Sequence, residues 1–132
     1  MIVDTSALVA VLLGEEDAEA IADALARGPV RISAATVVEA RVVLLAKVGP
    51  HGRRRLDALL LEADVEIVPT DAAQADVAAD AYRDYGKGTG HPASLNLGDC
   101  FSYALATVLR EPLLYKGGDF SHTDIRSVLP TP

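Results

Sequence analysis

Three apolar segments of this chain each carry an isolated acid near one end, and this pattern constrains the fold more than any other feature. Residues 96–109 are predicted to form a helix whose apolar side chains recur at helical spacing, and Asp99 is its only formal charge. Asp4 is the only charge in residues 1–13, and Glu39 shares residues 34–46 with Arg41 alone. Because a carboxylate that enters a core needs a cap, a partner or a metal ion, the fold must supply one to each acid.

Strand patterns and helix patterns alternate along the chain. Short apolar strands are predicted at 1–3, 30–32, 65–68 and 112–116, with a short edge strand at 126–129. Helices are predicted at 7–13, 15–27, 35–48, 53–63, 71–85 and 96–109. Without a tight hairpin signal, this order predicts an α/β fold, a three-layer α/β/α sandwich around a mostly parallel sheet of four to five strands.

Length and composition bound the class of protein. At 132 residues the chain is expected to form one domain, residues 1–132, large enough to fold without disulfides. Its single cysteine, Cys100, can form no internal disulfide, so a cytoplasmic location is expected. No apolar run reaches the ~18 residues of a membrane span, and the N-terminus lacks the basic region of a signal peptide. The net charge of −7 argues against a broad electrostatic hold on nucleic acid.

Four acids are expected to converge on one edge of the sheet, where open α/β sheets place their ligand sites: Asp4, Glu39, Asp99 and Asp119. Taken singly, each acid is also explained as a helix cap or a partner of a helix dipole, and Glu39 fits a capping box with Thr36. Clustered carboxylates repel and call for a cation, and all-oxygen ligation suits Mg²⁺ or Mn²⁺. The predicted reaction class is metal-assisted hydrolysis of a phosphodiester.

Four short motifs occur in order along the chain: IVDTSAL at 2–8, VVEA at 37–40, LGDC at 97–100 and KGGDFSHTDI at 116–125. Together they resemble PIN-domain ribonucleases of the VapC toxin type, over essentially the whole chain. The resemblance implies a Mg²⁺- or Mn²⁺-dependent endoribonuclease, usually a homodimer, that cleaves structured RNA of the translation machinery. It also implies a VapB-type antitoxin whose C-terminal segment lies across the toxin and blocks its site.

The resemblance assigns roles by position. Asp4, Glu39, Asp99 and Asp119 are the catalytic, metal-holding acids, and Ser6 is the hydroxyl that supports a water molecule on the metal. Ser6 is explained equally well as a helix N-cap. Asp119 lies immediately before the phenylalanine of the last motif, as in a subset of relatives. Many relatives place this acid three residues before the phenylalanine, where this chain has a glycine.

Basic side chains cluster in one stretch of the sequence, namely Lys47, His51, Arg53, Arg54 and Arg55. The cluster is either a solvated helix start or a grip on RNA phosphates, and Arg53, Arg54 and Arg55 are the predicted RNA-binding residues. For the antitoxin, the helices at 7–13 and 15–27 are the predicted groove, although packing on the sheet explains their apolar residues equally well.

Three other classes of protein stay open at this point. A receiver-like phosphoacceptor domain would use Lys116 and Asp71, but it leaves Glu39 and Asp99 unexplained. A small phosphatase with an Asp4 nucleophile would need a second aspartate two residues later, where the chain has a serine. A catalytically silent binding protein with the PIN fold is compatible with the same residues.

Overall fold

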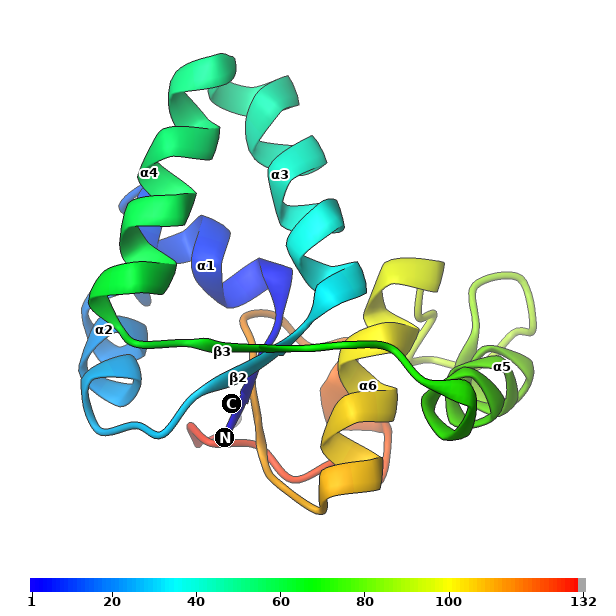
Figure 1. Ribbon diagram of the computed structural model, residues 1–132. Coiled ribbons are helices and arrows are strands. Elements are labelled where there is room, and N and C mark those ends of the chain that lie inside the picture. The colour runs from blue at the N-terminus through cyan, green and yellow to red at the C-terminus, as the bar shows by residue number, and fades with distance from the viewer. Residues whose placement is uncertain (131–132) are drawn as a thin grey trace.

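A parallel sheet forms the centre of the molecule (Figure 1). The structure, a computed structural model, describes residues 1–130, so the last two residues of the expected domain lie outside the description. Within residues 1–130 the sheet has four strands, β1 (Ile2–Val3), β2 (Arg31–Ser33), β3 (Glu66–Val68) and β4 (Leu113–Leu114), in the order β3-β2-β1-β4. Every pairing is parallel, which confirms the predicted sheet.

Helices cover both faces of this sheet. On one face lie α1 (Thr5–Leu12), α2 (Ala18–Ala26), α3 (Ala34–Val48) and α4 (Pro50–Glu62); on the other lie α5 (Ala72–Tyr85) and α6 (Leu97–Leu109). Because successive strand residues point to opposite faces, Val3 packs into the first core and Ile2 into the second. The three-layer α/β/α architecture is therefore confirmed. A short 3-10 helix, η1 (Phe120–His122), follows β4.

Through residue 130, the chain contains no helix with both the length and the apolar character to cross a membrane.

Some boundaries differ from the sequence prediction. The predicted strand at 126–129 is reduced to one parallel bridge between Leu113 and Ser127, in which Val128 donates to Leu113. The next donor in this register would be residue 130, which is a proline without an N–H group. α4 begins at Pro50, three residues earlier than predicted, since proline suits the first turn of a helix. The cap of α3 is Ser33, whose hydroxyl accepts from the Ala35 amide, so the capping box predicted for Thr36 and Glu39 is wrong.

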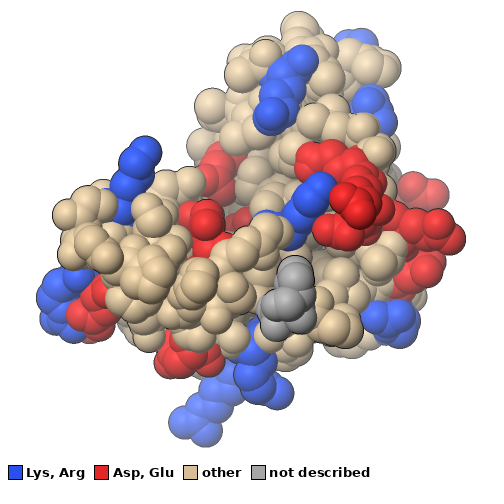
Figure 2. All heavy atoms as spheres, turned by 180° about the vertical axis from the view of Figure 1, so that it is seen from behind, with Lys and Arg blue, Asp and Glu red and all other residues tan. Residues whose placement is uncertain are grey.

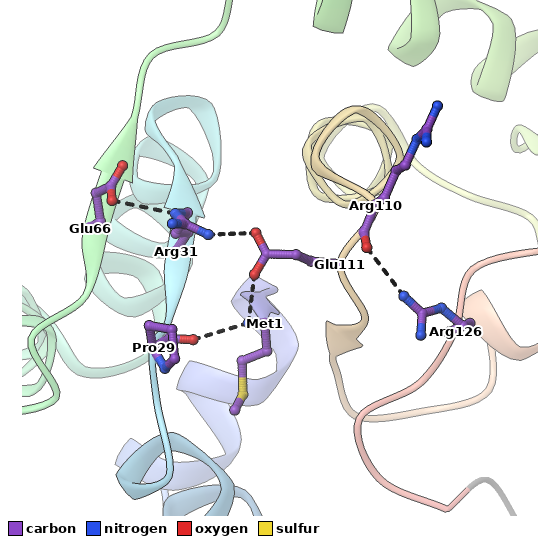
Figure 3. Close-up of polar contacts among 7 residues, drawn as sticks. All are labelled: Met1, Pro29, Arg31, Glu66, Arg110, Glu111 and Arg126. Carbon is purple, nitrogen blue, oxygen red and sulfur yellow. Dashed lines mark hydrogen bonds and ion pairs between the residues drawn. The ribbon is translucent and has the colours of Figure 1, made fainter.

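A network of ion pairs ties the amino-terminal edge of the sheet together (Figure 3). The ammonium group of Met1 pairs with Glu111 at 2.9 Å, and Arg31 bridges Glu111 at 2.6 Å and Glu66 at 3.3 Å. Burial opposes ionisation of Glu111, but the ammonium and guanidinium groups outweigh it and hold the pKa of this carboxyl below its usual value. These contacts connect all four strands at their amino-terminal ends. The four acids of the predicted site follow at the opposite, carboxyl-terminal edge of the sheet.

Candidate active site

An acidic pocket of about 390 Å³ lies at the carboxyl ends of β1 and β4. β2 lies on one side of β1 and β4 on the other, so the strand order reverses next to β1. Open α/β sheets bind their ligands at such a switch point. The structure brings together here all five residues that the sequence singles out for catalysis: Asp4, Ser6, Glu39, Asp99 and Asp119. A larger cavity of about 620 Å³, between α2 and the C-terminal segment, is lined by none of the four acids.

Asp4 is the most deeply placed acid of the pocket, with 2% of its surface exposed. It follows β1 and caps α1, because its Oδ2 accepts from the Ser6 amide at 3.0 Å and from the Ser6 hydroxyl at 2.7 Å. Its Oδ1 accepts from the hydroxyl of Ser102 at 2.6 Å. The Asp4 carboxylate therefore both caps α1 and faces the pocket, so its role as a cap does not exclude a role in the site.

Glu39 and Asp99 enter the same pocket from α3 and α6, and both are half-buried. Burial and then the charge of Asp4 raise the pKa of Glu39, although the Thr5 hydroxyl, which donates to Glu39 at 2.5 Å, works the other way. Burial, followed by the charge of Asp4, raises the pKa of Asp99 to about 7. The charge of Asp4 thus disfavours the charged forms of Glu39 and Asp99, which is the electrostatic condition that a bound cation relieves.

Asp99 also belongs to a complete capping box at the start of α6. Its Oδ2 accepts from the Asn96 amide at 3.0 Å, and the Asn96 side chain accepts from the Asp99 amide at 2.8 Å. The box fixes the first turn of the helix and with it the position of the carboxylate.

Asp119 completes the acidic wall of the pocket from the segment after β4, where its side chain is exposed. Gly117 has a φ of 99°, in the left-handed region that favours glycine. Glycine therefore suits the conformation of the backbone at this position. Asp119 then reaches the pocket two residues later.

The carboxylate oxygens of the pocket are ligands that suit a hard divalent cation. Within residues 1–130, however, no group of three or more acidic, histidine or cysteine side chains is arranged to hold a metal ion. Oxygens of Asp4, Glu39 and Asp99 also accept the local hydrogen bonds described above. Mg²⁺ commonly binds through one or two carboxylates and keeps several waters, so it needs no closed protein cage. Carboxylate oxygens with raised pKa values are suitable donors for it.

Several residues of the site escape sequence reasoning. Thr5 and Ser102 donate to the acids, and Lys116 donates its backbone amide to the Ser6 hydroxyl at 3.0 Å. Glu15, Lys47 and Lys116 also line the pocket, and the Lys116 ammonium group pairs with Glu15 at 3.4 Å. A hydroxyl three residues from an isolated acid, on the same helix face, is a signal that could have revealed Ser102.

The predicted basic cluster is divided by the fold. Lys47 lines the acidic pocket, whereas Arg53, Arg54 and Arg55 lie on α4 and do not line it. Arg55 donates to the Leu12 carbonyl at 2.6 Å and so has a structural contact. Figure 2 shows basic side chains on the end of the molecule formed by α3 and α4, and acidic ones gathered where α2 lies.

Gly98 is a further residue of the site, because its backbone packs against the Glu39 carboxylate. A Cβ atom at this position would overlap Glu39 Oε2, the end of a flexible side chain. We expect Gly98→Ala to keep the fold, displace that carboxylate and lower divalent-metal affinity by about 10-fold or more, as changes beside metal ligands do. Titration of the metal-free protein with Mn²⁺ measures this. Gly118→Ala is the matched control, since its Cβ would meet nothing closer than 3.9 Å; equal affinities for the two variants would contradict the assignment.

Comparison with known proteins decides the family. Residues 1–126 match the family described as PIN domain. Ribonuclease VapC42 of Mycobacterium tuberculosis is 53% identical over 127 residues, which cover 96% of this chain and 97% of the relative. This chain is a PIN domain protein of the VapC family. Ribonuclease VapC28 of the same organism is 52% identical, with 98% of each chain covered.

Solved structures agree with the VapC fold. The crystal structure of Mycobacterium tuberculosis VapC20, described as a sarcin-ricin loop cleaving toxin, aligns with a TM-score of 0.75 at 20% identity over 98% of each chain. A toxin-antitoxin complex from Klebsiella pneumoniae aligns with a TM-score of 0.64 at 23% identity, over 91% of this chain and 89% of that one. At these identities the likeness supports the fold alone. Membership of the VapC family overturns the receiver and phosphatase alternatives.

Proposed function

We propose that this chain is the toxin of a type II toxin-antitoxin pair and that it hydrolyses RNA phosphodiester bonds with Mg²⁺ or Mn²⁺, thereby inhibiting translation. One observation carries the proposal: the four predicted acids and Glu15, from five separate segments, line one pocket at the switch point of the sheet. Family membership supports it, since the similar VapC42 and VapC28 are named ribonucleases. We place its action in the cytoplasm.

In this proposal Asp4, Glu39 and Asp99 hold the ion, and Asp119 adds negative charge from the exposed side of the pocket. When bound, the ion activates the attacking water and stabilises charge on the phosphate oxygens. The Ser6 hydroxyl, held by Asp4 and by the Lys116 amide, orients the carboxylate and the water. The ammonium group of Lys47, which lines the same pocket, attracts the phosphate of the substrate, whereas that of Lys116 pairs with Glu15.

Cleavage of RNA with and without a chelator tests the proposed activity. Purified protein treated with EDTA should be inactive, and added Mg²⁺ or Mn²⁺ should restore cleavage. Cleavage that survives the chelator would contradict the metal mechanism. A protein that binds RNA without cleaving it under any metal would instead be the catalytically silent PIN protein.

RNA affinity is expected to depend on the basic residues of α4. Changing Arg53 and Arg54 together to Ser should weaken RNA binding several-fold at low salt and lower the salt dependence of binding, because each lost phosphate contact removes one released counterion. Fluorescence anisotropy over a salt titration measures this. Arg83→Ser on α5, whose partners are Asp80 and Asp84, is the control. Equal RNA affinity and equal salt dependence for wild type and the α4 variant would show that Arg53 and Arg54 do not bind RNA. Arg55 is left unchanged in this experiment because it contacts Leu12.

For the inhibitor we propose a VapB-type antitoxin that lies along α1 and α2 and inserts an arginine into the acidic pocket. A guanidinium group would pair with the carboxylates and block the metal and the substrate together. The exposed acids of the α2 region, Glu16, Asp17, Glu19 and Asp23, favour a basic partner segment. An antitoxin peptide whose arginines are changed should bind less tightly; unchanged affinity would reject this contact.

For the oligomeric state we propose a homodimer through the outer face of α3. Val38, Val42 and Leu45 recur there at helical spacing and are 61%, 60% and 55% exposed. Such a stripe of large apolar side chains is typical of a surface that another chain covers. Light scattering of wild type and Val42→Glu tests this, and a monomeric wild type would contradict it.

A further inference from the structure

Two buried hydroxyl groups connect the elements that carry the acids. Ser102 of α6 and Thr36 of α3 are both fully buried, and their hydroxyl oxygens lie 3.2 Å apart. The Ser102 hydroxyl also lies 2.6 Å from Asp4 Oδ1, to which it donates. A continuous line of hydrogen bonds therefore runs from α3 through α6 to the end of β1.

The direction of this line follows from the number of protons. A hydroxyl has one proton, and a carboxylate can only accept, so the Ser102 proton goes to Asp4. In its contact with Thr36, Ser102 must then accept, and Thr36 donates. The order of donation is Thr36 to Ser102 to Asp4, and each buried hydroxyl has a partner.

The two hydroxyls are spaced one helical turn from the acids of their own helices. Ser102 lies three residues after Asp99 on α6, and Thr36 lies three residues before Glu39 on α3, so each hydroxyl shares a helix face with its acid. The hydrogen bond between them consequently fixes α3 against α6 next to both carboxylates. The bond to Asp4 adds the third acid to the same arrangement.

We propose that Thr36 and Ser102 are positioning residues, a buried hydroxyl relay that sets the orientation of the Asp4 carboxylate and the separation of Glu39 from Asp99. The inference rests on the proposed metal-dependent function and deepens it. A carboxylate offers about four acceptor positions. Ser102 and the amide and hydroxyl of Ser6 occupy three of them in Asp4, which leaves one, on Oδ1, for a metal ion. The relay thus determines the direction from which Asp4 can bind it.

Mn²⁺ binding to the full-length, metal-free protein tests the relay without relying on cleavage. Ser102→Ala should lower Mn²⁺ affinity by about 10-fold, the usual effect of losing an outer-shell partner of a metal ligand, and should change the electron paramagnetic resonance spectrum of the bound ion. Thr36→Val should have a smaller effect. Because Thr36 acts only through Ser102, adding Thr36→Val to Ser102→Ala should change nothing further.

A control and a rescue separate positioning from general loss of stability. Leu105→Val, a buried truncation on the same helix, should lower the melting temperature and leave Mn²⁺ affinity and spectrum unchanged. Ser102→Thr, which restores the hydroxyl, should recover the affinity that Ser102→Ala loses. Where Ser102→Ala does not fold, Thr36→Val alone decides, since it leaves Ser102 in place.

The outcomes distinguish this inference from the function on which it rests. Wild type that binds Mn²⁺ in the pocket, with unchanged affinity and spectrum in Ser102→Ala and Thr36→Val, would overturn the relay and leave the metal site intact. Wild type that binds no Mn²⁺ would overturn the metal site, and the relay with it. Additive effects of the two substitutions would contradict the chain of donation from Thr36 through Ser102.

Discussion

Replacing Asp4 with Asn should lower the rate of RNA cleavage by at least about 1,000-fold, on the order of 4 kcal/mol of transition-state stabilisation. The substitution removes the charge of the most buried carboxylate of the pocket while keeping its shape. The variant should still fold, because the Ser102 hydroxyl can accept from the new amide group and donate to Thr36 instead. Single-turnover cleavage at saturating enzyme measures the chemical step.

Glu16→Gln is the matched control for this substitution, since it removes one exposed acid from the α2 region. It should cleave like wild type. The double variant Asp4→Asn/Glu39→Gln should be scarcely slower than Asp4→Asn alone, because residues that hold one ion act as a unit. Full cleavage activity of Asp4→Asn would show that Asp4 takes no part in the reaction. Strictly additive losses of activity in the double variant would argue against one ion held by both acids.

Replacing Asp99 with Asn should stabilise the metal-free protein at pH 8, with the melting temperature raised by about 5 °C for each kcal/mol gained. The pKa of Asp99 is raised from 3.8 to about 7, so its charged form is unfavourable in the folded state. The amide keeps the oxygen that accepts from Asn96 and therefore preserves the cap. The charged Asp99 thus lowers the stability of the metal-free protein. Such a cost is expected where a carboxylate is needed to bind a cation.

The sign of the pH dependence follows from the same pKa. Between pH 3.8 and about 7, folded Asp99 retains a proton that the unfolded chain has released, so the contribution of Asp99 to the stability of the wild type rises as the pH falls through this window. The gain from Asp99→Asn should accordingly fade below pH 4. Mg²⁺ or Mn²⁺ at pH 8 should stabilise the wild type more than the variant, since only the wild type has all three carboxylates.

Thermal unfolding at pH 8 and pH 4, with and without metal, checks this prediction. Asp76→Asn on the exposed surface of α5 is the control and should show no such pattern. A wild type more stable than Asp99→Asn at pH 8 in the absence of metal would contradict the repulsion inferred among the acids.

The order of helices and strands is predictable from this sequence because each strand is a short apolar run with a helix after it. The starts of helices are harder to predict. Ser33 and Thr36 are both good caps for α3, and Thr70 and Asp71 both suit α5; only the backbone decides for Ser33 and Asp71. Gly49 alone separates the end of α3 from Pro50, which starts α4, and composition alone does not reveal so short a connection.

The acids of the site can be predicted from the sequence, whereas the residues that position them cannot. Asp4, Glu39 and Asp99 each stand alone in an apolar segment, and that isolation is visible in the sequence. Ser102 and Thr36 are small hydroxyls of a kind common on buried helix faces, so their roles depend on contacts between α3, α6 and β1. Gly98 has its role because α6 passes close to Glu39, and no local pattern reports such an approach.

A crystal grown with Mn²⁺ gives the most direct measurement of whether distant segments of the chain hold one divalent ion. The anomalous scattering of the metal locates it independently of the protein atoms. We expect a peak in the acidic pocket, with oxygens of Asp4 and at least one of Glu39 and Asp99 at about 2.1 Å from it. A fully occupied metal elsewhere, or an empty pocket at saturating Mn²⁺, would contradict the account.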